Sequence, residues 1–299
     1  MPDAARTIDL PDGRTLAYAE WGDPDGRPIL NCHGTPGCRL NRHPNQDLVR
    51  STGARVIAFD RPGYGRSTRK RGRRVVDVVD DVARLADRLG LAEFAVVGGS
   101  GGGPHALAVA ALLPDRVTRA GCIVGVAPYD VLGGDAWFTG MDPLNVKEFS
   151  WALDGEERAH AELAREDAEM RARVAEDPSN VLGDFDLPEA DRKVLARADV
   201  ATVIRESTNE QSANGVWGWV DDDLAFTIPW GFDPATISVP TAVWWGEADV
   251  LVPPQHGEWI AATVPGALTR VRRDGGHQPD PEKDVVVLNR WLLDGEPWD

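Results

Sequence analysis

The 299-residue sequence predicts an α/β fold in which helices flank a mostly parallel sheet and a helical region is inserted into the chain. Short apolar runs that end in glycine-rich turns alternate with helical patterns, as a parallel sheet covered on both faces requires. Between about Tyr129 and Pro234 the alternation stops, and a charged helical region that contains residues 156–176 replaces it. We therefore expect a core of residues 1–128 and 235–299, and a helical cap of residues 129–234.

A hairpin is expected to begin the sheet. Residues 5–23 surround the turn sequence Pro11-Asp12-Gly13, and the second arm runs from Thr15 to Glu20. Later strands are predicted from short apolar runs and helices from amphipathic spacing. The predicted strands are 28–32, 55–60, 94–99, 119–125, 241–245 and 268–273, and the predicted helices outside the cap are 75–89, 101–113 and 283–293.

The most informative motif follows the strand at 94–99, where Gly98, Ser100 and Gly102 form the pattern G-x-S-x-G and a helical pattern begins at once. A strand that reverses into a helix within a few residues forces the serine to a positive φ, and its glycine neighbours let the chain fold back. The helix start also directs backbone N–H groups at an anion formed there. Ser100 is therefore the candidate nucleophile. A glycine-rich phosphate loop is disfavoured, because no G-x-x-x-x-G-K-S/T pattern occurs.

A second glycine-rich turn, His33-Gly34-Thr35-Pro36-Gly37, follows the apolar run at 28–32. Acyl transfer needs two donors directed at the developing oxyanion, and a turn with little side-chain bulk brings a backbone N–H close enough. Thr35 is the expected donor here, since Pro36 has no N–H. The other is Gly101, directly after the nucleophile. We interpret His33 as a residue that fixes the loop by hydrogen bonding rather than as a base.

Two further candidates follow strands late in the chain. Asp249 lies in the loop after the strand at 241–245, and His277 follows the strand at 268–273. An imidazole in a loop is suited to move a proton between Ser100 and a leaving group, while a carboxylate holds its tautomer. Alone, the two would be a capping aspartate and a surface histidine. Their order after Ser100, each just past a strand, favours a catalytic set.

These motifs together resemble those of α/β-hydrolase fold enzymes with a cap domain. The resemblance rests on residues 33–37, 60–67 (Asp-Arg-Pro-Gly-Tyr-Gly-Arg-Ser), 98–102, 246–249 and 275–277, and it covers nearly the whole chain. It implies a sheet of the eight-stranded type, with Ser100 as nucleophile, His277 as base and Asp249 as acid. Thr35 and Gly101 would form the oxyanion hole. The HGxPG turn is most similar to that of the proline iminopeptidase branch.

Tryptophans are unexpectedly frequent in the cap region. Large aromatic side chains under a lid can line an apolar pocket and exclude water, so Trp137, Trp217 and Trp219 are candidate substrate-binding residues. The alternative is that they fill the cap's own core. Gly215 and Gly218 favour a loop around Trp217 and Trp219.

Acidic residues in the cap allow two interpretations. Asp221, Asp222 and Asp223 are expected to cap a helix start, although they are also suited to receive a cationic group. In an aminopeptidase, carboxylates such as Glu206 or Glu210 would bind a free amine. Metal binding lacks a spaced histidine partner, and we expect neither a metal nor a cofactor.

The composition limits the partners. A formal net charge of −16 disfavours nucleic acid and anionic membranes. No apolar run approaches the roughly 20 residues of a membrane span, and the first six residues lack a leader's apolar core, so we expect a cytoplasmic protein. Cys32, Cys38 and Cys122 are expected to be reduced thiols.

The sequence thus predicts a serine hydrolase that cleaves a small ester, lactone or amide through an acyl-enzyme. A proline iminopeptidase-like aminopeptidase, a non-hydrolytic enzyme on the same scaffold and a ligand-binding protein are the alternatives. The expected partner is a small-molecule substrate, and a homodimer stays open.

Overall fold

An eight-stranded sheet forms the centre of the molecule in the computed structural model, which describes residues 6–296 and 298. The strand order is β1-β2-β4-β3-β5-β6-β7-β8; β2 is antiparallel to both its neighbours, and the other pairs are parallel. The predicted α/β class is therefore confirmed. The strands are β1 (Arg6–Asp9), β2 (Thr15–Gly22), β3 (Arg27–Cys32), β4 (Ala54–Phe59), β5 (Phe94–Gly99), β6 (Val117–Ile123), β7 (Thr241–Gly246) and β8 (Leu268–Arg272).

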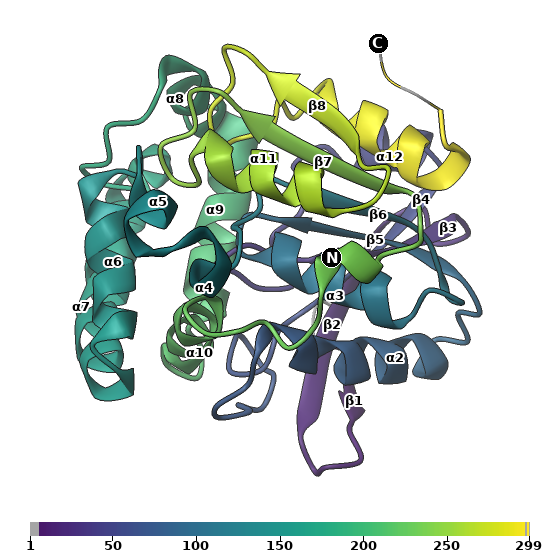
Figure 1. Ribbon diagram of the computed structural model, residues 1–299, viewed down its shortest axis with the longest axis horizontal. Helices are drawn as coiled ribbons and strands as arrows, with labels where there is room; N and C mark the ends of the chain where they lie inside the picture. The colour runs from purple at the N-terminus through teal and green to yellow at the C-terminus, as the bar shows by residue number, and fades with distance from the viewer. Residues whose placement is uncertain (1–5, 297, 299) are drawn as a thin grey trace.

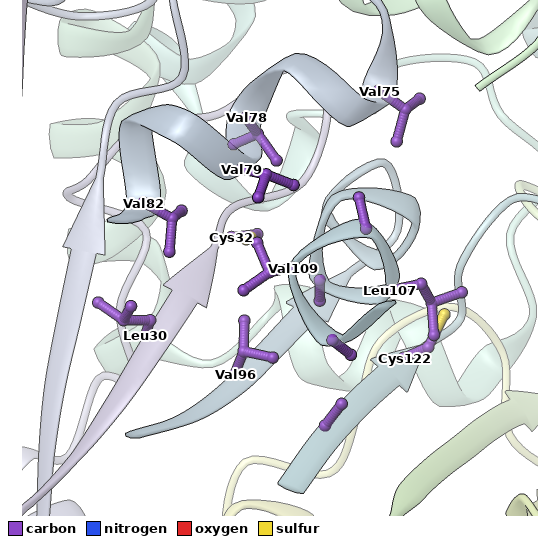
Figure 2. Close-up of a cluster of buried hydrophobic side chains, with 14 of the residues drawn as sticks. Leu30, Cys32, Val75, Val78, Val79, Val82, Val96, Leu107, Val109 and Cys122 are labelled. Atoms are coloured by element: carbon purple, nitrogen blue, oxygen red, sulfur yellow. The ribbon is translucent and has the colours of Figure 1, made fainter. Parts of the chain in front are cut away.

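Helices cover both faces of this sheet (Figure 1). On one face, the side chains of β3, β5 and β6 pack against α2 and α3, as Figure 2 shows for Leu30, Val96 and Cys122 beneath Val82 and Leu107. On the other face, residues of β3, β5 and β7 pack against α1 and α12. These helices are α1 (Gln46–Ser51), η1 (Val75–Asp77), α2 (Val78–Arg88), α3 (Gly102–Leu112), α11 (Pro254–Thr263) and α12 (Asp284–Asp294).

Most of these elements agree with the sequence prediction within a residue or two. The hairpin pairs Ile8 with Leu16 across the predicted turn. Residues 1–5, which include the predicted first residue of the hairpin and most of the segment considered for a leader, lie outside the described residues. The helix expected at 75–89 opens with one 3-10 turn. The short helix α1 and the helix α11 were not predicted, because neither carries a long amphipathic repeat.

A group of helices, joined by short loops, connects β6 to β7 and lies beside the sheet, at the left of Figure 1. The longest, α7, lies within the region predicted to be helical and charged. It buries Ala159, Leu163, Met170 and Val174, together with the charged Glu162 and Asp167. The helices are α4 (Tyr129–Leu132), α5 (Gly134–Phe138), α6 (Pro143–Leu153), α7 (Glu156–Glu176), η2 (Pro178–Asn180), α8 (Glu189–Leu195), α9 (Ala198–Gln211), α10 (Trp217–Phe226) and η3 (Pro234–Thr236). In the described part of the chain, no helix is both long and apolar enough to cross a membrane.

Candidate active site

The turn between β5 and α3 holds Ser100 in a strained conformation. Its φ is +53°, in the left-handed region that side chains rarely adopt. The turn needs its glycines: a Cβ on Gly98 would lie 2.0 Å from the Gly102 carbonyl oxygen, and one on Gly102 would lie 2.1 Å from that of Cys32. The Ser100 N–H donates to the Ile123 carbonyl at 2.8 Å, which ties the turn to β6. The chain therefore lifts this hydroxyl above the carboxyl ends of the strands.

Asp249 and His277 form a hydrogen-bonded pair at the same edge of the sheet. His277 Nδ1 lies 2.8 Å from Asp249 Oδ2, and Asp249 Oδ1 accepts the N–H groups of Leu251 and Val252 at 2.9 Å each. Burial alone lowers the pKa of His277, but the charge and hydrogen bond of Asp249 outweigh it, so the pKa is raised above its usual value. The carboxylate thus fixes the orientation of the ring through Nδ1 and leaves Nε2 available to exchange a proton.

One cavity of about 780 Å³ brings the candidates together. Ser100, His277, Thr35 and Gly101 all line it, and Asp249 is buried behind His277. A Cβ on Gly101 would lie 2.3 Å from Thr35 Oγ1, so the two residues predicted to bind an oxyanion are in close contact. A side chain at position 101 would also approach Phe226 to 2.9 Å. Glycine at this position keeps the space beside the serine open.

A carboxylate from the cap, which the sequence analysis missed, holds the histidine loop. Asp191 on α8 is fully buried and accepts the N–H groups of His277 at 2.9 Å and Gln278 at 2.8 Å. A Cβ on Gly276 would lie 2.3 Å from Asp191 Oδ2, so a bare residue is needed for this approach. The sequence signal was only the glycine before the histidine. The cap thereby helps to set the position of His277.

The family follows from comparison with known sequences. The family model described as alpha/beta hydrolase fold matches residues 27–279. The chain belongs to the α/β hydrolase fold family.

Individual relatives of this α/β hydrolase are named for different activities. A non-heme chloroperoxidase from Streptomyces lividans is 38% identical over 125 residues, 41% of this chain and 45% of that protein. A proline iminopeptidase from Neisseria meningitidis serogroup A is 25% identical over 89% of this chain and 88% of its own. The chain spans less than half the length of the Streptomyces protein and of an Arabidopsis thaliana proline iminopeptidase that it matches.

Solved structures show the same fold. An alpha/beta hydrolase fold protein from Chitinophaga pinensis has a TM-score of 0.69 at 18% identity, and 98% of each chain is covered. A thermophilic esterase from Thermogutta terrifontis has a TM-score of 0.62 at 23% identity, again with 98% of each chain covered. At these identities the likeness concerns the fold.

Beneath the Thr35 turn, the hydrolase buries an ionic cluster around Asp222. Asp222 Oδ2 accepts from Thr35 Oγ1 at 2.7 Å and from the Tyr64 hydroxyl at 2.9 Å. The Arg61 and Arg73 guanidinium groups pair with the same carboxylate. Burial alone raises the pKa of Asp222, but the two arginines hold it well below its usual range.

This cluster corrects the prediction for the three consecutive aspartates. We expected residues 221–223 to cap a helix start, but they lie inside α10 and are buried. Asp221 pairs with Arg69 at 2.8 Å. Asp222 therefore connects α10 to the Thr35 turn and the Arg61 loop. Pattern alone could not reveal the arginines, because Arg61 and Arg73 lie about 150 residues earlier in the chain.

The other histidines near the site contact the scaffold of the hydrolase. His33 Nδ1 lies 2.8 Å from the Gly34 carbonyl oxygen, and its Nε2 accepts the N–H of Arg61 at 3.1 Å. Burial and the charge of Arg61 hold the pKa of His33 well below its usual value. His105 is buried below the turn, 3.7 Å from Asp222 Oδ1. The contacts of His33 agree with the loop-fixing role expected for it, and His105 is likewise part of the scaffold.

Of the three candidate tryptophans, Trp219 lines the cavity and the other two do not. Trp219 Nε1 donates to Glu148 Oε1 at 2.8 Å. Trp217 lies between Arg69, 3.6 Å from its ring centroid, and the stacked His160 ring at 4.0 Å. Trp137 is fully buried and donates to the Ala127 carbonyl at 2.7 Å. For Trp137 and Trp217 the expected lining role is therefore corrected to a packing role.

The expected loop around these tryptophans is also wrong. Trp217 and Trp219 lie in α10, and Gly218 is a helical residue that packs against the core. A Cβ on Gly218 would lie 2.5 Å from Tyr64 Cγ. The glycine therefore allows the helix to approach Tyr64 closely, and tertiary packing outweighs its low helix propensity.

The carboxylates proposed for amine binding are engaged elsewhere. Glu206 pairs with Arg42 at 2.6 Å, and Glu210 pairs with Arg39 at 2.6 Å and Arg66 at 2.9 Å. Neither lines the cavity. The glutamates that line it are Glu148, Glu166 and Glu169.

The cysteines of the hydrolase are free and buried, and burial raises the pKa values of Cys32 and Cys122 to about 12. Within residues 6–296 and 298, no group of three His, Cys, Asp or Glu side chains is arranged to hold a metal ion.

Proposed function

We propose that this α/β hydrolase cleaves a small ester, lactone or amide through an acyl-enzyme on Ser100. The observation that carries the proposal is the combination of a serine at φ +53° with a hydrogen-bonded Asp249–His277 pair on one cavity. A strained nucleophile, a base and an orienting acid are the parts that acyl transfer needs.

In this mechanism, His277 Nε2 accepts the proton of Ser100 as the hydroxyl attacks the substrate carbonyl. Asp249 holds the Nδ1 tautomer and stabilises the imidazolium that forms. The backbone N–H groups of Thr35 and Gly101 would donate to the oxyanion. His277 then protonates the leaving group and activates water to release the acid.

An aminopeptidase is the second candidate function. Its support is the full-length similarity to Neisseria proline iminopeptidases together with the glutamates on the cavity wall. Burial raises the pKa of Glu148 to about 7. A free amine bound there would have to keep this carboxyl ionised.

Initial rates distinguish these candidates. We would compare p-nitrophenyl acetate with L-proline p-nitroanilide, using wild type, Ser100→Ala and the exposed-serine control Ser51→Ala. The proposal expects ester turnover that is lost in Ser100→Ala and kept in Ser51→Ala. Higher kcat/KM on the anilide would favour the aminopeptidase. Equal ester hydrolysis by Ser100→Ala and wild type would overturn the assignment of Ser100 as the nucleophile.

A further inference from the structure

The cavity at Ser100 has a second arm that lies outside the cap helices. Its lining continues from Ser100 past Asn31 and Gly99, onto the face of the sheet that α1 and α12 cover. We call this extension the sheet arm and the remainder, beneath the cap helices, the cap arm. The apolar residues lining the sheet arm include Ile29, Val56, Val97, Trp244, Val285 and Leu288.

This face of the sheet is incompletely covered. Val56 and Val97 lie on central strands, yet both side chains are only partly buried. The covering helix α1 has only six residues. Asn289 on α12 donates to Thr52 Oγ1, at the end of α1, at 3.1 Å and so holds the two helices together at one point.

Both arms have largely apolar walls, and they differ in their charged residues. The cap arm carries Glu148, Glu166, Glu169 and Arg173 beside its apolar side chains. On the other side of Ser100, Asp284 is paired with Arg270 at 3.1 Å, and Arg42, His43 and Asp280 line the cavity just before α1 and α12 in the chain. A ligand group that passes along β3, β5 and β7 in the sheet arm therefore meets mainly the apolar residues named above.

We propose that the sheet arm binds the apolar acyl chain of an ester substrate, while the polar leaving group faces the cap arm. This inference rests on the proposed function, because the chain reaches the arm from a carbonyl held at Ser100. Burial of each methylene corresponds to about a fourfold gain in kcat/KM. The hydrolase would therefore prefer medium-length acyl esters to acetates until the arm is filled.

The test is the acyl chain-length profile of p-nitrophenyl esters, from acetate to decanoate. Leu288→Trp fills the sheet arm, and Leu182→Trp is the matched control because Leu182 lines the cap arm. We expect Leu288→Trp to lose at least about tenfold on octanoate relative to acetate, and Leu182→Trp to keep the wild-type profile. Leu288→Ala should move the optimum to longer chains, which guards against a merely misfolded Trp variant.

Each outcome decides a separate claim. A flat wild-type profile on esters that are turned over, or loss of octanoate preference only in Leu182→Trp, would overturn the sheet-arm proposal and leave the serine mechanism standing. Absence of any ester turnover that depends on Ser100 would overturn the proposed function itself, and the acyl-chain inference with it.

Discussion

Two buried aspartates of this hydrolase, Asp249 and Asp222, lie near the same cavity but have different kinds of partner. Asp249 has one histidine and two backbone N–H groups as partners, and that histidine lines the cavity. Asp222 has two arginines, a tyrosine and a threonine, and none of its oxygen surface is exposed. In the proposed mechanism, the first carboxylate raises the pKa of a ring that exchanges protons. The second compensates charges that must stay fixed.

The difference shows how partners determine the role of a buried carboxylate. The one titratable partner of Asp249 is His277, and the carboxylate raises the pKa of that ring. Two guanidinium groups, which stay protonated, make an immobile cluster that joins cap and core. Disruption of Asp249 should therefore act on kcat, and disruption of Asp222 on folding.

The largest expected effect is on catalysis by Asp249→Asn. The amide cannot hold the same imidazole tautomer or stabilise its cation, so kcat for an ester should fall by about 10³- to 10⁴-fold. The unfolding midpoint in urea, measured beside the rates, should move little, because the amide oxygen still accepts from Leu251 and Val252. A large stability loss with normal kcat in the folded fraction would reverse the assigned roles.

Asp222→Asn should mainly destabilise the fold. It leaves Arg61 and Arg73 buried without their counter-charge, which costs about 3–5 kcal/mol in the free energy of unfolding. Urea denaturation checks this value. The neighbouring Asp221→Asn is the control and should cost less, since its partner Arg69 is partly exposed and also pairs with Glu156. Similar losses in both variants would argue against a special role for Asp222.

The pH dependence of kcat/KM tests the electrostatics of the Asp249–His277 pair. Only a neutral imidazole accepts the serine proton, so the rate should rise about tenfold per pH unit below the pKa of His277 and then level off. Because Asp249 raises that pKa, the midpoint should lie above 6.5. Asp249→Asn should shift it downward. A wild-type midpoint below 6.5 would contradict the upward shift in the pKa of His277.

Asp191→Asn tests the contact from the cap to the histidine loop. The amide keeps the shape but offers only one acceptor oxygen for two N–H groups, so we expect kcat to fall by about five- to tenfold with KM nearly unchanged. The acid limb should also move to lower pH, since the charge of Asp191 helps to raise the pKa of His277. The exposed Asp186→Asn in the preceding loop is the control. If the acid limb of the pH profile does not shift, Asp191 is only a structural contact and does not influence the pKa of His277.

The smallest effect is expected for Trp217→Ala. This ring packs against Arg69 and His160 outside the cavity, so kcat/KM should stay within about twofold, with a stability loss of about 1 kcal/mol. Trp219→Ala should instead raise KM, because Trp219 lines the cavity. Equal changes in KM would mean that both rings contact substrate.

The sheet and the turn at Ser100 could be predicted because their signals are local. Gly98 and Gly102 are required by contacts within a few residues of the motif or with the adjacent strand. The G-x-S-x-G pattern alone therefore predicts the geometry of the turn. Asp249 and His277 each follow a strand, and parallel strands bring such loops to one edge.

The cap could not be predicted to the same depth because its contacts are distant in sequence. The partners of Asp222 lie on the Thr35 turn and the Arg61 loop, and Asp191 reaches a loop 86 residues later. Gly218 is typical of a loop by propensity, yet its contact with Tyr64 places it in a helix. Trp137 and Trp219 have the same hydrophobic character, and only tertiary packing decides which of them lines the cavity.

Labelling with a fluorophosphonate, followed by peptide mapping, identifies the nucleophile of this hydrolase. We expect one covalent adduct, on Ser100, that forms slowly in Asp249→Asn and is absent in Ser100→Ala. An adduct on a different residue, or equal labelling of Ser100→Ala, would contradict the assignment of Ser100 as the nucleophile.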